Sequence, residues 1–375
     1  MKKFDIHIVL LSDQVLPNVL PVLDTAIKPK KVILCESDAM TGRGVGTNLE
    51  KFYKGKGLET EIIPLGTAYD YAQMQEVFLG IATDLEGGNE SVGINLTGGT
   101  KLMSIAAQNI FSAAGFTCFY SIPQKNEITV VADGKDSPYK INDKIKLKDY
   151  FAVHGYLVES KSSKKFRIND DSRNLCNDLL SNFSVYKESI GFLNMLASKA
   201  ADAYSLKIRN DIPEQHDGIL ELFSKYHFIR EYDDRRVIFE SAQDRDYCNG
   251  LWLEEFVHIC LSDLNRDIGL QDFATTITIV SPTGTKNELD AAFLFNNNLY
   301  IIEAKTSRMY DKGADILYKL DSLKDYAGMY TRPIVVTFKP LKGYDKKRAE
   351  DLKIKLIEGS AIKNLSKHIK DYIGK

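Results

Sequence analysis

The first half of the chain alternates short apolar runs with longer amphipathic stretches. Five runs have the length of buried strands: Ile6–Leu11, Val32–Cys35, Thr60–Ile63, Val92–Leu96 and Thr117–Ser121. Apolar residues at helical spacing lie between them, over Val15–Ala26, Asn48–Lys54, Tyr71–Leu85 and Leu102–Ala114. Because strands that alternate with helices of this length form parallel sheets covered on both faces, the pattern predicts an α/β domain of the doubly wound, Rossmann-like kind.

The middle of the chain is more polar and mostly helical. Glu159–Arg173 is charged and serine-rich, which predicts a linker or exposed loop. Helical spacing resumes over Leu175–Tyr204 and Gly218–Tyr226, and a hairpin is predicted over Phe228–Glu240, turning at Asp233-Asp234. We interpret this region as a mostly helical connector, with a winged-helix element that contacts nucleic acid as the alternative.

The last third of the chain begins with a helix and continues as a hairpin. Gly250–Val257 has apolar residues at helical spacing and holds the chain's single tryptophan. Phe293–Phe295 and Leu299–Ile302 flank the turn Asn296–Asn298, which predicts two paired strands. The expected domains are therefore residues 1–140, 141–245 and 246–375.

Composition indicates a globular protein and excludes several classes. Of 375 residues, 44% are hydrophobic and 27% are charged, and no apolar run nears the roughly 20 residues of a membrane helix. Met1–Asp5 leads into a strand rather than a signal peptide, so we expect no membrane partner. The five cysteines lack a CxxC pair, which favours reduced thiols in the cytoplasm over structural zinc: Cys35, Cys118, Cys176, Cys248 and Cys260.

A glycine-rich turn joins the fourth predicted strand to a helix, and its residues are Thr97, Gly98, Gly99, Thr100 and Lys101. A helix N-terminus offers unpaired N–H groups and a positive dipole end, which suit a phosphate. Strand order in doubly wound sheets usually reverses between the first and fourth strands, so the turn with Ser12 and Gln14 is expected at the same crevice. A plain βα turn is the alternative. The fingerprints of nicotinamide, flavin and P-loop nucleotide sites are absent.

Two carboxylates and a lysine bracket the predicted hairpin. Asp290 precedes its first strand, and Glu303-Ala304-Lys305 ends its second. Residues i and i+2 of a strand share a face, so Glu303 and Lys305 should point to the same side. Carboxylate and carbonyl oxygens suit Mg²⁺ or Mn²⁺, which predicts a metal site at Asp290, Glu303 and the Ala304 carbonyl. An edge hairpin with a solvated Glu–Lys pair is the alternative.

The set Asp290, Glu303-x-Lys305 resembles the PD-(D/E)xK nuclease signature, although Glu288-Leu289 stands where that motif often has proline. The resemblance implies a restriction-endonuclease-like α/β/α domain and metal-dependent phosphodiester hydrolysis. It also implies a third carboxylate from the opening helix. Glu254 is our candidate for it, and Glu255 is the alternative.

The first 140 residues, with their N-x-TGGTK turn, resemble a CRISPR-associated Rossmann-fold (CARF) sensor domain. The whole chain resembles the CARF-fused ancillary nucleases of type III CRISPR antiviral defence. This resemblance implies a homodimer activated allosterically by a cyclic oligoadenylate, usually cyclic tetra-adenylate. It implies a ligand site at Ser12, Gln14 and Thr97 to Lys101, and cleavage of single-stranded DNA, RNA or both, with duplex DNA as a further possible substrate.

Net charge is the feature least typical of a nuclease. The chain has 49 Lys and Arg against 51 Asp and Glu, a net charge of −2, whereas non-specific nucleic-acid binders often carry a positive excess. A local basic surface is compatible with this balance, and Lys312, Lys319 and Lys324 follow the hairpin. Solvated helix faces are the alternative interpretation of these lysines.

A different function is also open at this stage. In it, the chain is a nucleotide-sensing, DNA-binding transcriptional regulator whose nuclease-like domain is inactive. The intact Asp290, Glu303 and Lys305 favour the nuclease, because an inactive domain is expected to lose at least one of the three.

Overall fold

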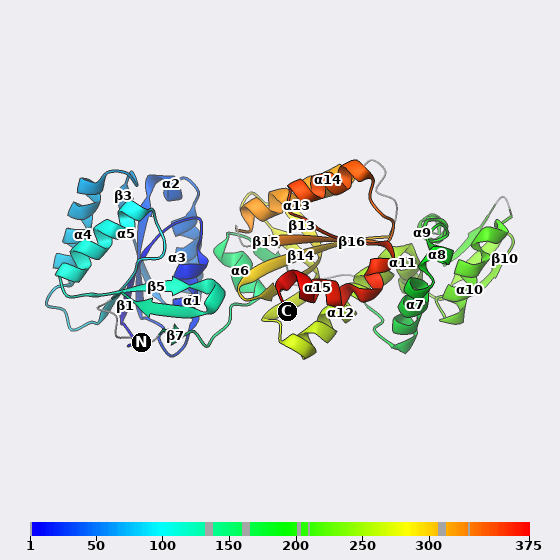
Figure 1. Cartoon of the computed structure of the whole chain (residues 1–375), viewed down its shortest axis with the longest axis horizontal. Helices are drawn as coiled ribbons and strands as arrows, with labels where there is room; N and C mark the ends of the chain where they lie inside the picture. The colour runs from blue at the N-terminus through cyan, green and yellow to red at the C-terminus, as the bar shows by residue number, and fades with distance from the viewer. Residues whose placement is uncertain are drawn as a thin grey trace.

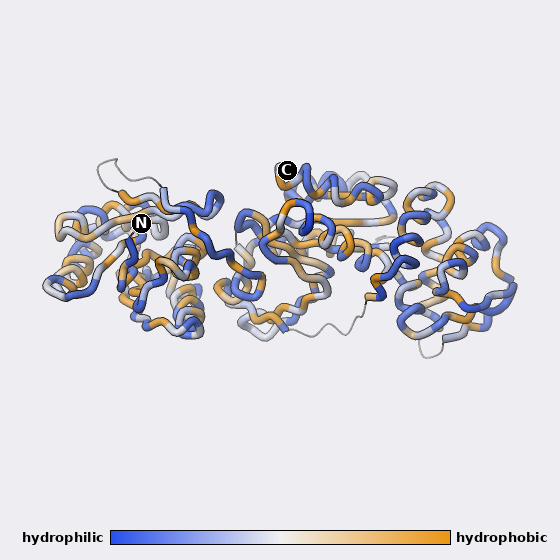
Figure 2. Tube along the Cα trace, turned by 90° about the horizontal axis from the view of Figure 1, so that it is seen from below, coloured by the Kyte–Doolittle hydropathy of each residue, from blue (hydrophilic) through white to orange (hydrophobic). Residues whose placement is uncertain are grey.

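The computed structural model describes residues 2–131, 138–159, 166–200, 204–208, 211–306, 313–328 and 331–375. These residues form three sheets and their covering helices, arranged as three lobes in a row (Figures 1 and 2). The N-terminal lobe lies at one end, the C-terminal domain lies in the centre, and the middle of the chain forms the lobe at the other end. Spatial order therefore differs from sequence order.

The N-terminal domain is a seven-stranded sheet in the order β3-β2-β1-β4-β5-β6-β7. Strands β1 to β5 are parallel, and β6 and β7 are antiparallel. The five predicted strands are confirmed, whereas the sequence pattern misses β6 and β7 because they are short and partly polar. The strands are β1 (Ile6–Leu10), β2 (Lys31–Ser37), β3 (Glu59–Gly66), β4 (Val92–Asn95), β5 (Thr117–Ile122), β6 (Glu127–Val130) and β7 (Tyr139–Lys140).

Helices cover both faces of this sheet, as the alternating pattern predicts. α1 (Leu16–Leu23) and α3 (Val45–Gly55) pack in one hydrophobic cluster, and α4 (Tyr71–Leu85) and α5 (Lys101–Ala113) pack in another. The short α2 (Asp38–Thr41) and η1 (Pro123–Lys125) complete the domain. β1 pairs with both β2 and β4, so the predicted reversal of strand order between β1 and β4 is confirmed.

The first helix is shorter than its pattern predicts, because α1 ends at Leu23 rather than Ala26. Asp24 turns extended there, with a ψ angle of 110°. Its carboxylate accepts hydrogen bonds from the backbone N–H groups of Ala26 and Asn142. These bonds hold the chain in a turn instead of a further helical turn.

The central domain is a six-stranded sheet in the order β16-β15-β14-β13-β12-β8. In Figure 1, α13 and α14 lie on one side of its strands and α12 and α15 on the other, which confirms the predicted α/β/α arrangement. The strands are β8 (Leu157–Glu159), β12 (Asp272–Val280), β13 (Lys286–Phe295), β14 (Asn298–Lys305), β15 (Thr331–Thr337) and β16 (Lys355–Glu358). The helices are α6 (Leu147–Val153), α12 (Trp252–Ile268), α13 (Gly313–Tyr326), α14 (Gly343–Asp351), η4 (Gly359–Asn364) and α15 (Leu365–Ile373).

The third lobe is helical with a small antiparallel sheet in the order β10-β11-β9. The predicted short helix and hairpin are present as α10, β10 and β11. Residues 160–165 of the predicted linker lie outside the described residues, and Asp170 already begins α7. The elements are α7 (Asp170–Ser181), α8 (Phe183–Tyr186), α9 (Ile190–Lys199), β9 (Ser205–Lys207), η2 (Glu214–His216), α10 (Asp217–Lys225), β10 (Ile229–Asp233), β11 (Arg236–Phe239), α11 (Ala242–Asp246) and the π-helical turn η3 (Tyr247–Leu251). The winged-helix alternative stays a prediction.

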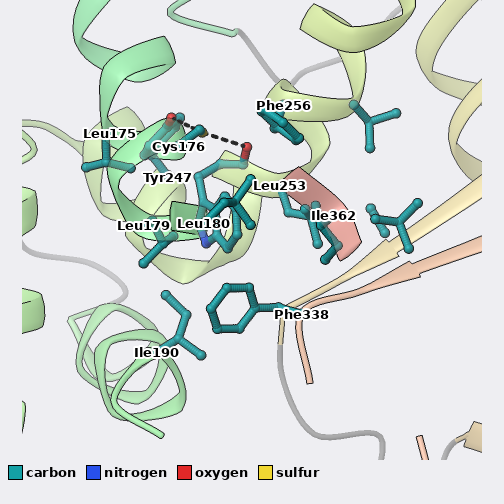
Figure 3. Packing of buried hydrophobic residues seen from close by; sticks show 14 of the residues in the cluster. Leu175, Cys176, Leu179, Leu180, Ile190, Tyr247, Leu253, Phe256, Phe338 and Ile362 are labelled. Carbon is teal, nitrogen blue, oxygen red and sulfur yellow. Dashed lines mark hydrogen bonds between the residues drawn. The ribbon is translucent and has the colours of Figure 1, made fainter. Parts of the chain in front are cut away.

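The third lobe and the central domain share one hydrophobic core. Figure 3 shows Leu179 of α7 and Ile190 of α9 near Leu253 of α12 and Phe338 after β15, and all four belong to one buried cluster. Because close-packed interiors transmit displacement rather than absorb it, these two lobes should move as one body.

All five cysteines are buried and unpaired, consistent with reduced thiols. Among the described helices, none combines the length and apolar character that crossing a lipid bilayer requires.

Candidate functional site

The glycine turn of the N-terminal domain lies directly against the end of β1. A Cβ atom added to Gly98 would stand 1.9 Å from the carbonyl oxygen of Leu10, so only glycine fits this close approach. Gly99 has a φ of +73°, a conformation that also favours glycine. The turn after β4 is thereby held beside the turn that follows β1, which brings the two predicted halves of the ligand site together.

Thr100 begins helix α5 as its N-cap. Its hydroxyl accepts a hydrogen bond from the Met103 N–H at 3.3 Å and donates one to the Ala68 carbonyl at 3.3 Å. Lys101 is the first residue of the helix, and its side chain is exposed. This arrangement directs the N-terminal end of a 13-residue helix and one ammonium group toward the same edge of the sheet.

Thr97 has a different environment from the rest of the turn. Its hydroxyl donates to the Asn95 side chain at 2.7 Å and accepts from the Ser121 N–H of β5 at 2.7 Å. It therefore links the turn to the neighbouring strand. Ser12 and Gln14 are half-buried, and the Ser12 hydroxyl lies 3.4 Å from the Gln14 carbonyl.

In the central domain, the structure brings Asp290, Glu303 and Lys305 together on adjacent strands. The Lys305 Nζ atom lies 3.2 Å from Asp290 Oδ2 and 2.9 Å from Glu303 Oε1. The backbone N–H of Ala304 donates to Asp290 Oδ2 at 2.7 Å. Asp290 and Glu303 are only 6% and 4% exposed, so the solvated-pair alternative does not describe them.

Lys319 joins this cluster from helix α13. Its Nζ atom lies 3.3 Å from Glu303 Oε2 and donates to the Glu288 carbonyl at 3.1 Å. One of the helical lysines singled out in the sequence therefore reaches the site. Lys324 pairs with Asp321 instead, and Lys312 lies outside the described residues.

The Lys305 ammonium is held strongly in its charged form. Burial by itself would lower the pKa of Lys305, but the nearby carboxylates of Asp290 and Glu303 outweigh it and raise that pKa above the ordinary lysine value. In the metal-free structure these two carboxylates therefore favour the ammonium form of Lys305.

The two candidate glutamates of α12 have separate surroundings. Glu255 is fully buried and accepts hydrogen bonds from the N–H groups of Arg167 and Ile168 at 2.8 and 3.1 Å, so it anchors the segment before α7. Glu254 is half-buried, one turn beyond Gly250. A Cβ atom on Gly250 would meet the Thr306 hydroxyl at 2.6 Å, which places the start of α12 against the residue that follows Lys305.

Two family models match the chain. The model of the Card1 CARF domain matches residues 6–150, and the model of the Card1-like endonuclease domain matches residues 241–375. The chain belongs to the CARF-fused nucleases. The N-terminal domain is hence a CARF domain, and the central domain is an endonuclease domain.

Solved structures share this fold over nearly the whole chain. Protein VC1899 from Vibrio cholerae has a TM-score of 0.87 and 24% identity, covering 98% of both chains. Can2 from Sulfobacillus thermosulfidooxidans, solved in complex with cyclic tetra-adenylate, has a TM-score of 0.79 and 23% identity, covering 99% of this chain and 98% of that one. A type III CRISPR defence DNA nuclease activated by cyclic oligoadenylate has a TM-score of 0.54 and 16% identity. The match covers 90% of this chain and 46% of that one. No curated protein matches the chain.

The endonuclease cluster offers a donor set that fits a hard divalent cation. Its two buried carboxylates supply oxygen ligands, whereas the described residues contain no group of three or more His, Cys, Asp and Glu placed to hold a metal ion. Mg²⁺ commonly binds through one or two carboxylates and keeps several waters. Asp290 and Glu303 therefore fit such an ion, with the Ala304 carbonyl as the further predicted ligand.

A polar contact between the endonuclease domain and the third lobe lies outside the sequence predictions. The Asn194 side chain of α9 and the Thr306 hydroxyl are 2.8 Å apart, and Asn194 is 8% exposed. An isolated asparagine in a helical pattern carries no sequence signal for such a role. The contact fixes the end of the strand that carries Lys305.

Proposed function

We propose that this chain is a metal-dependent endonuclease of type III CRISPR defence, activated by a cyclic oligoadenylate, with cyclic tetra-adenylate as the proposed activator. The observation that carries the proposal is the buried cluster of Asp290, Glu303 and Lys305 in a chain that also has a CARF domain. The Can2 structure binds cyclic tetra-adenylate within the same overall fold. The proposed substrate is single-stranded DNA, RNA or both, with duplex DNA as the alternative.

Each residue of the cluster has a distinct task in this proposal. Asp290 and Glu303 would hold Mg²⁺ or Mn²⁺, assisted by the Ala304 carbonyl and by Glu254. When bound, the ion activates a water and neutralises charge on the scissile phosphate. The Ala304 N–H fixes one oxygen of Asp290, so the carboxylate is oriented before substrate arrives.

Lys305 acts as a cation rather than as a base. Because its pKa is raised, its ammonium group has no lone pair with which to remove a proton. It can donate hydrogen bonds to the attacking water or to a phosphate oxygen, which stabilises the charge that develops in the transition state.

The direct test is cleavage by the purified full-length protein. Labelled single- and double-stranded DNA and RNA are incubated with Mn²⁺ or Mg²⁺, with and without cyclic tetra-adenylate. We expect cleavage only with metal and a strong increase with the cyclic nucleotide. Equal cleavage with and without the nucleotide would reject the activation, and no cleavage in any mixture would favour the regulator with an inactive nuclease-like domain.

Lys319 should tune the affinity of the carboxylates for metal. Its ammonium competes for Glu303, so Lys319→Ala should strengthen Mn²⁺ binding by about two- to fivefold, as expected for one partly exposed ion pair. Calorimetric Mn²⁺ titration without nucleic acid measures this change, and Lys324→Ala on the same helix is the control, because Lys324 pairs with Asp321. Weaker Mn²⁺ binding by Lys319→Ala would contradict this role.

We further propose that the protein is a homodimer joined through its CARF domains. Helices α4 and α5 expose large apolar side chains: Leu79 is 56% exposed, Leu102 38% and Ile105 50%. Leu102 and Ile105 are three residues apart and lie close to the turn at Lys101. An isologous contact there would set two ligand turns side by side, which suits a ring of repeated units.

Placing a charge in this apolar surface should separate the subunits. Ile105→Glu should convert the dimer into a monomer of 42.2 kDa, because a buried unpaired carboxylate is strongly unfavourable. Sedimentation with and without ligand measures the mass. Val185→Glu on α8, an apolar position in the third lobe that is even more exposed at 66%, should leave the dimer intact. A wild-type protein that sediments as a monomer under both conditions would refute the dimer.

The division into residues 1–140, 141–245 and 246–375 stays a proposal, as does a cytoplasmic location. The CARF match ends at 150 and the endonuclease match begins at 241, near the proposed borders. Within the connector, β8 pairs with β12 and so adds an edge strand to the endonuclease sheet.

A further inference from the structure

The tip of the catalytic hairpin is inserted into the CARF domain. Asn297, in the turn between β13 and β14, is 2% exposed, and its side-chain NH₂ donates to the Pro123 carbonyl and to Asn126 Oδ1, both at 2.6 Å. Pro123 and Asn126 belong to the turn between β5 and β6 of the CARF sheet. One asparagine thus fastens the two domains at the turn between β5 and β6, outside the residues predicted for either functional centre.

The endonuclease side of this contact is rigid. Gln271, which is 6% exposed, donates from Nε2 to Asn297 Oδ1 at 2.8 Å and accepts from the Asn297 N–H at 2.6 Å. Asn297 has a φ of 58°, a left-handed conformation that asparagine tolerates better than most residues. With its amide groups all bonded, Asn297 has a single orientation toward the CARF domain.

On the CARF side, the turn between β5 and β6 is linked through β5 to the ligand turn, which is the segment Thr97 to Lys101. The Thr97 hydroxyl holds the Ser121 N–H of β5, and Pro123 follows two residues later. A displacement of Thr97 would therefore be carried along β5 to the carbonyl that Asn297 contacts.

On the endonuclease side, the hairpin connects Asn297 to the catalytic groups. Strands β13 and β14 pair without interruption from Phe295–Asn298 to Ala291–Ile302. Asp290 and Glu303 follow immediately beyond that last pair. Asp290 is five residues from Phe295, about 17 Å at the usual rise of a strand. A hydrogen-bonded ladder of this length is stiff, so a shift of its tip changes the placement of Asp290 and Glu303.

We propose that Asn297 is a positioning residue that couples the CARF ligand turn to the catalytic carboxylates. This inference rests on the proposed ligand activation and specifies the contact that transmits it. Ligand binding would then move the hairpin through its tip.

The test uses glycine substitutions in the full-length protein, because glycine accepts the left-handed conformation without strain. Asn297→Gly removes both donors to the CARF domain. Asn296→Gly is the matched control, since Asn296 is adjacent, has a φ of 47° and is exposed. Cleavage rate with and without cyclic tetra-adenylate is measured, together with the affinity of each protein for that nucleotide and its melting temperature.

We expect the ratio of stimulated to unstimulated cleavage to fall by about tenfold or more in Asn297→Gly, a typical allosteric coupling. Nucleotide affinity should change by no more than the same coupling factor, and Asn296→Gly should behave as wild type. If Asn297→Gly melts near the assay temperature, Asn126→Gly tests the contact from the CARF side, where φ is 52°. Full stimulation in a folded variant of either kind would overturn the coupling while leaving the nuclease assignment intact. A wild-type protein that the nucleotide does not stimulate would overturn the coupling together with the proposed ligand activation.

Discussion

Replacing Lys305 with alanine should slow nucleic-acid cleavage by about 10²–10³-fold at saturating metal and activator, the usual loss when one preorganised electrostatic contact is removed. Lys305 contacts both Asp290 and Glu303, so no other described group duplicates its position. Glu303→Ala should lower the cleavage rate at least as much, because it removes a proposed metal ligand together with the partner of Lys319. Initial rates of cleavage of a labelled oligonucleotide measure both losses.

The control for Lys305→Ala is Lys286→Ala. Lys286 lies at the start of β13 on the same sheet and makes an exposed ion pair with Glu159. Its loss should leave the cleavage rate within about twofold, because exposed pairs contribute little. Both proteins should bind the cyclic nucleotide like the wild type. Cleavage by Lys305→Ala at the parental rate would show that the chemistry lies elsewhere.

The pH dependence of stability follows from the same cluster. Since the pKa of Lys305 is raised, any stability it gives the folded state is present below the ordinary lysine pKa and is lost only at strongly alkaline pH. In the metal-free protein, Lys305 should therefore contribute no change in the free energy of unfolding between about pH 6 and pH 9.

The two candidate sites could be proposed from the sequence because each depends on local patterns. The turn at Thr97–Lys101 is recognised from adjacent residues. Glu303 and Lys305 are predicted to share a face because side chains alternate along a strand. Asp290 could be added because a single short turn joins its strand to theirs. Strand alternation likewise predicted the CARF sheet and the reversal of order between β1 and β4.

Contacts between distant segments left no comparable pattern. Asn297 occurs in an asparagine-rich turn, and turn propensity alone explains its presence there. Its contact with Pro123 spans 174 residues of sequence, and that of Asn194 with Thr306 spans 112. Nor does the alternation of polar and apolar residues place the third lobe beyond the endonuclease domain, because its shared core with α12 depends on tertiary packing.

The second large effect is expected on activation by the cyclic nucleotide. A ligand shifts a conformational equilibrium only by its difference in affinity for the two states, so weakening ligand contact must weaken activation. Lys101→Ala removes an exposed ammonium at the first residue of α5. A hydrogen bond to a charged group is typically worth about 1.5–3 kcal/mol, so we expect the half-maximal activating concentration of cyclic tetra-adenylate to rise at least about tenfold. The maximal rate at saturating nucleotide should be unchanged.

Two further proteins make this prediction specific. Thr100→Ser keeps the hydroxyl that caps α5 and should activate like the wild type, whereas Thr100→Ala would remove the helix cap and any ligand contact of that hydroxyl together. Lys140→Ala, on strand β7 at the edge of the CARF sheet, removes a lysine that pairs with Glu127 and should activate normally. If Lys101→Ala responds to the nucleotide at wild-type concentrations, the ligand does not contact this helix end, and the site assigned to residues 97–101 is wrong.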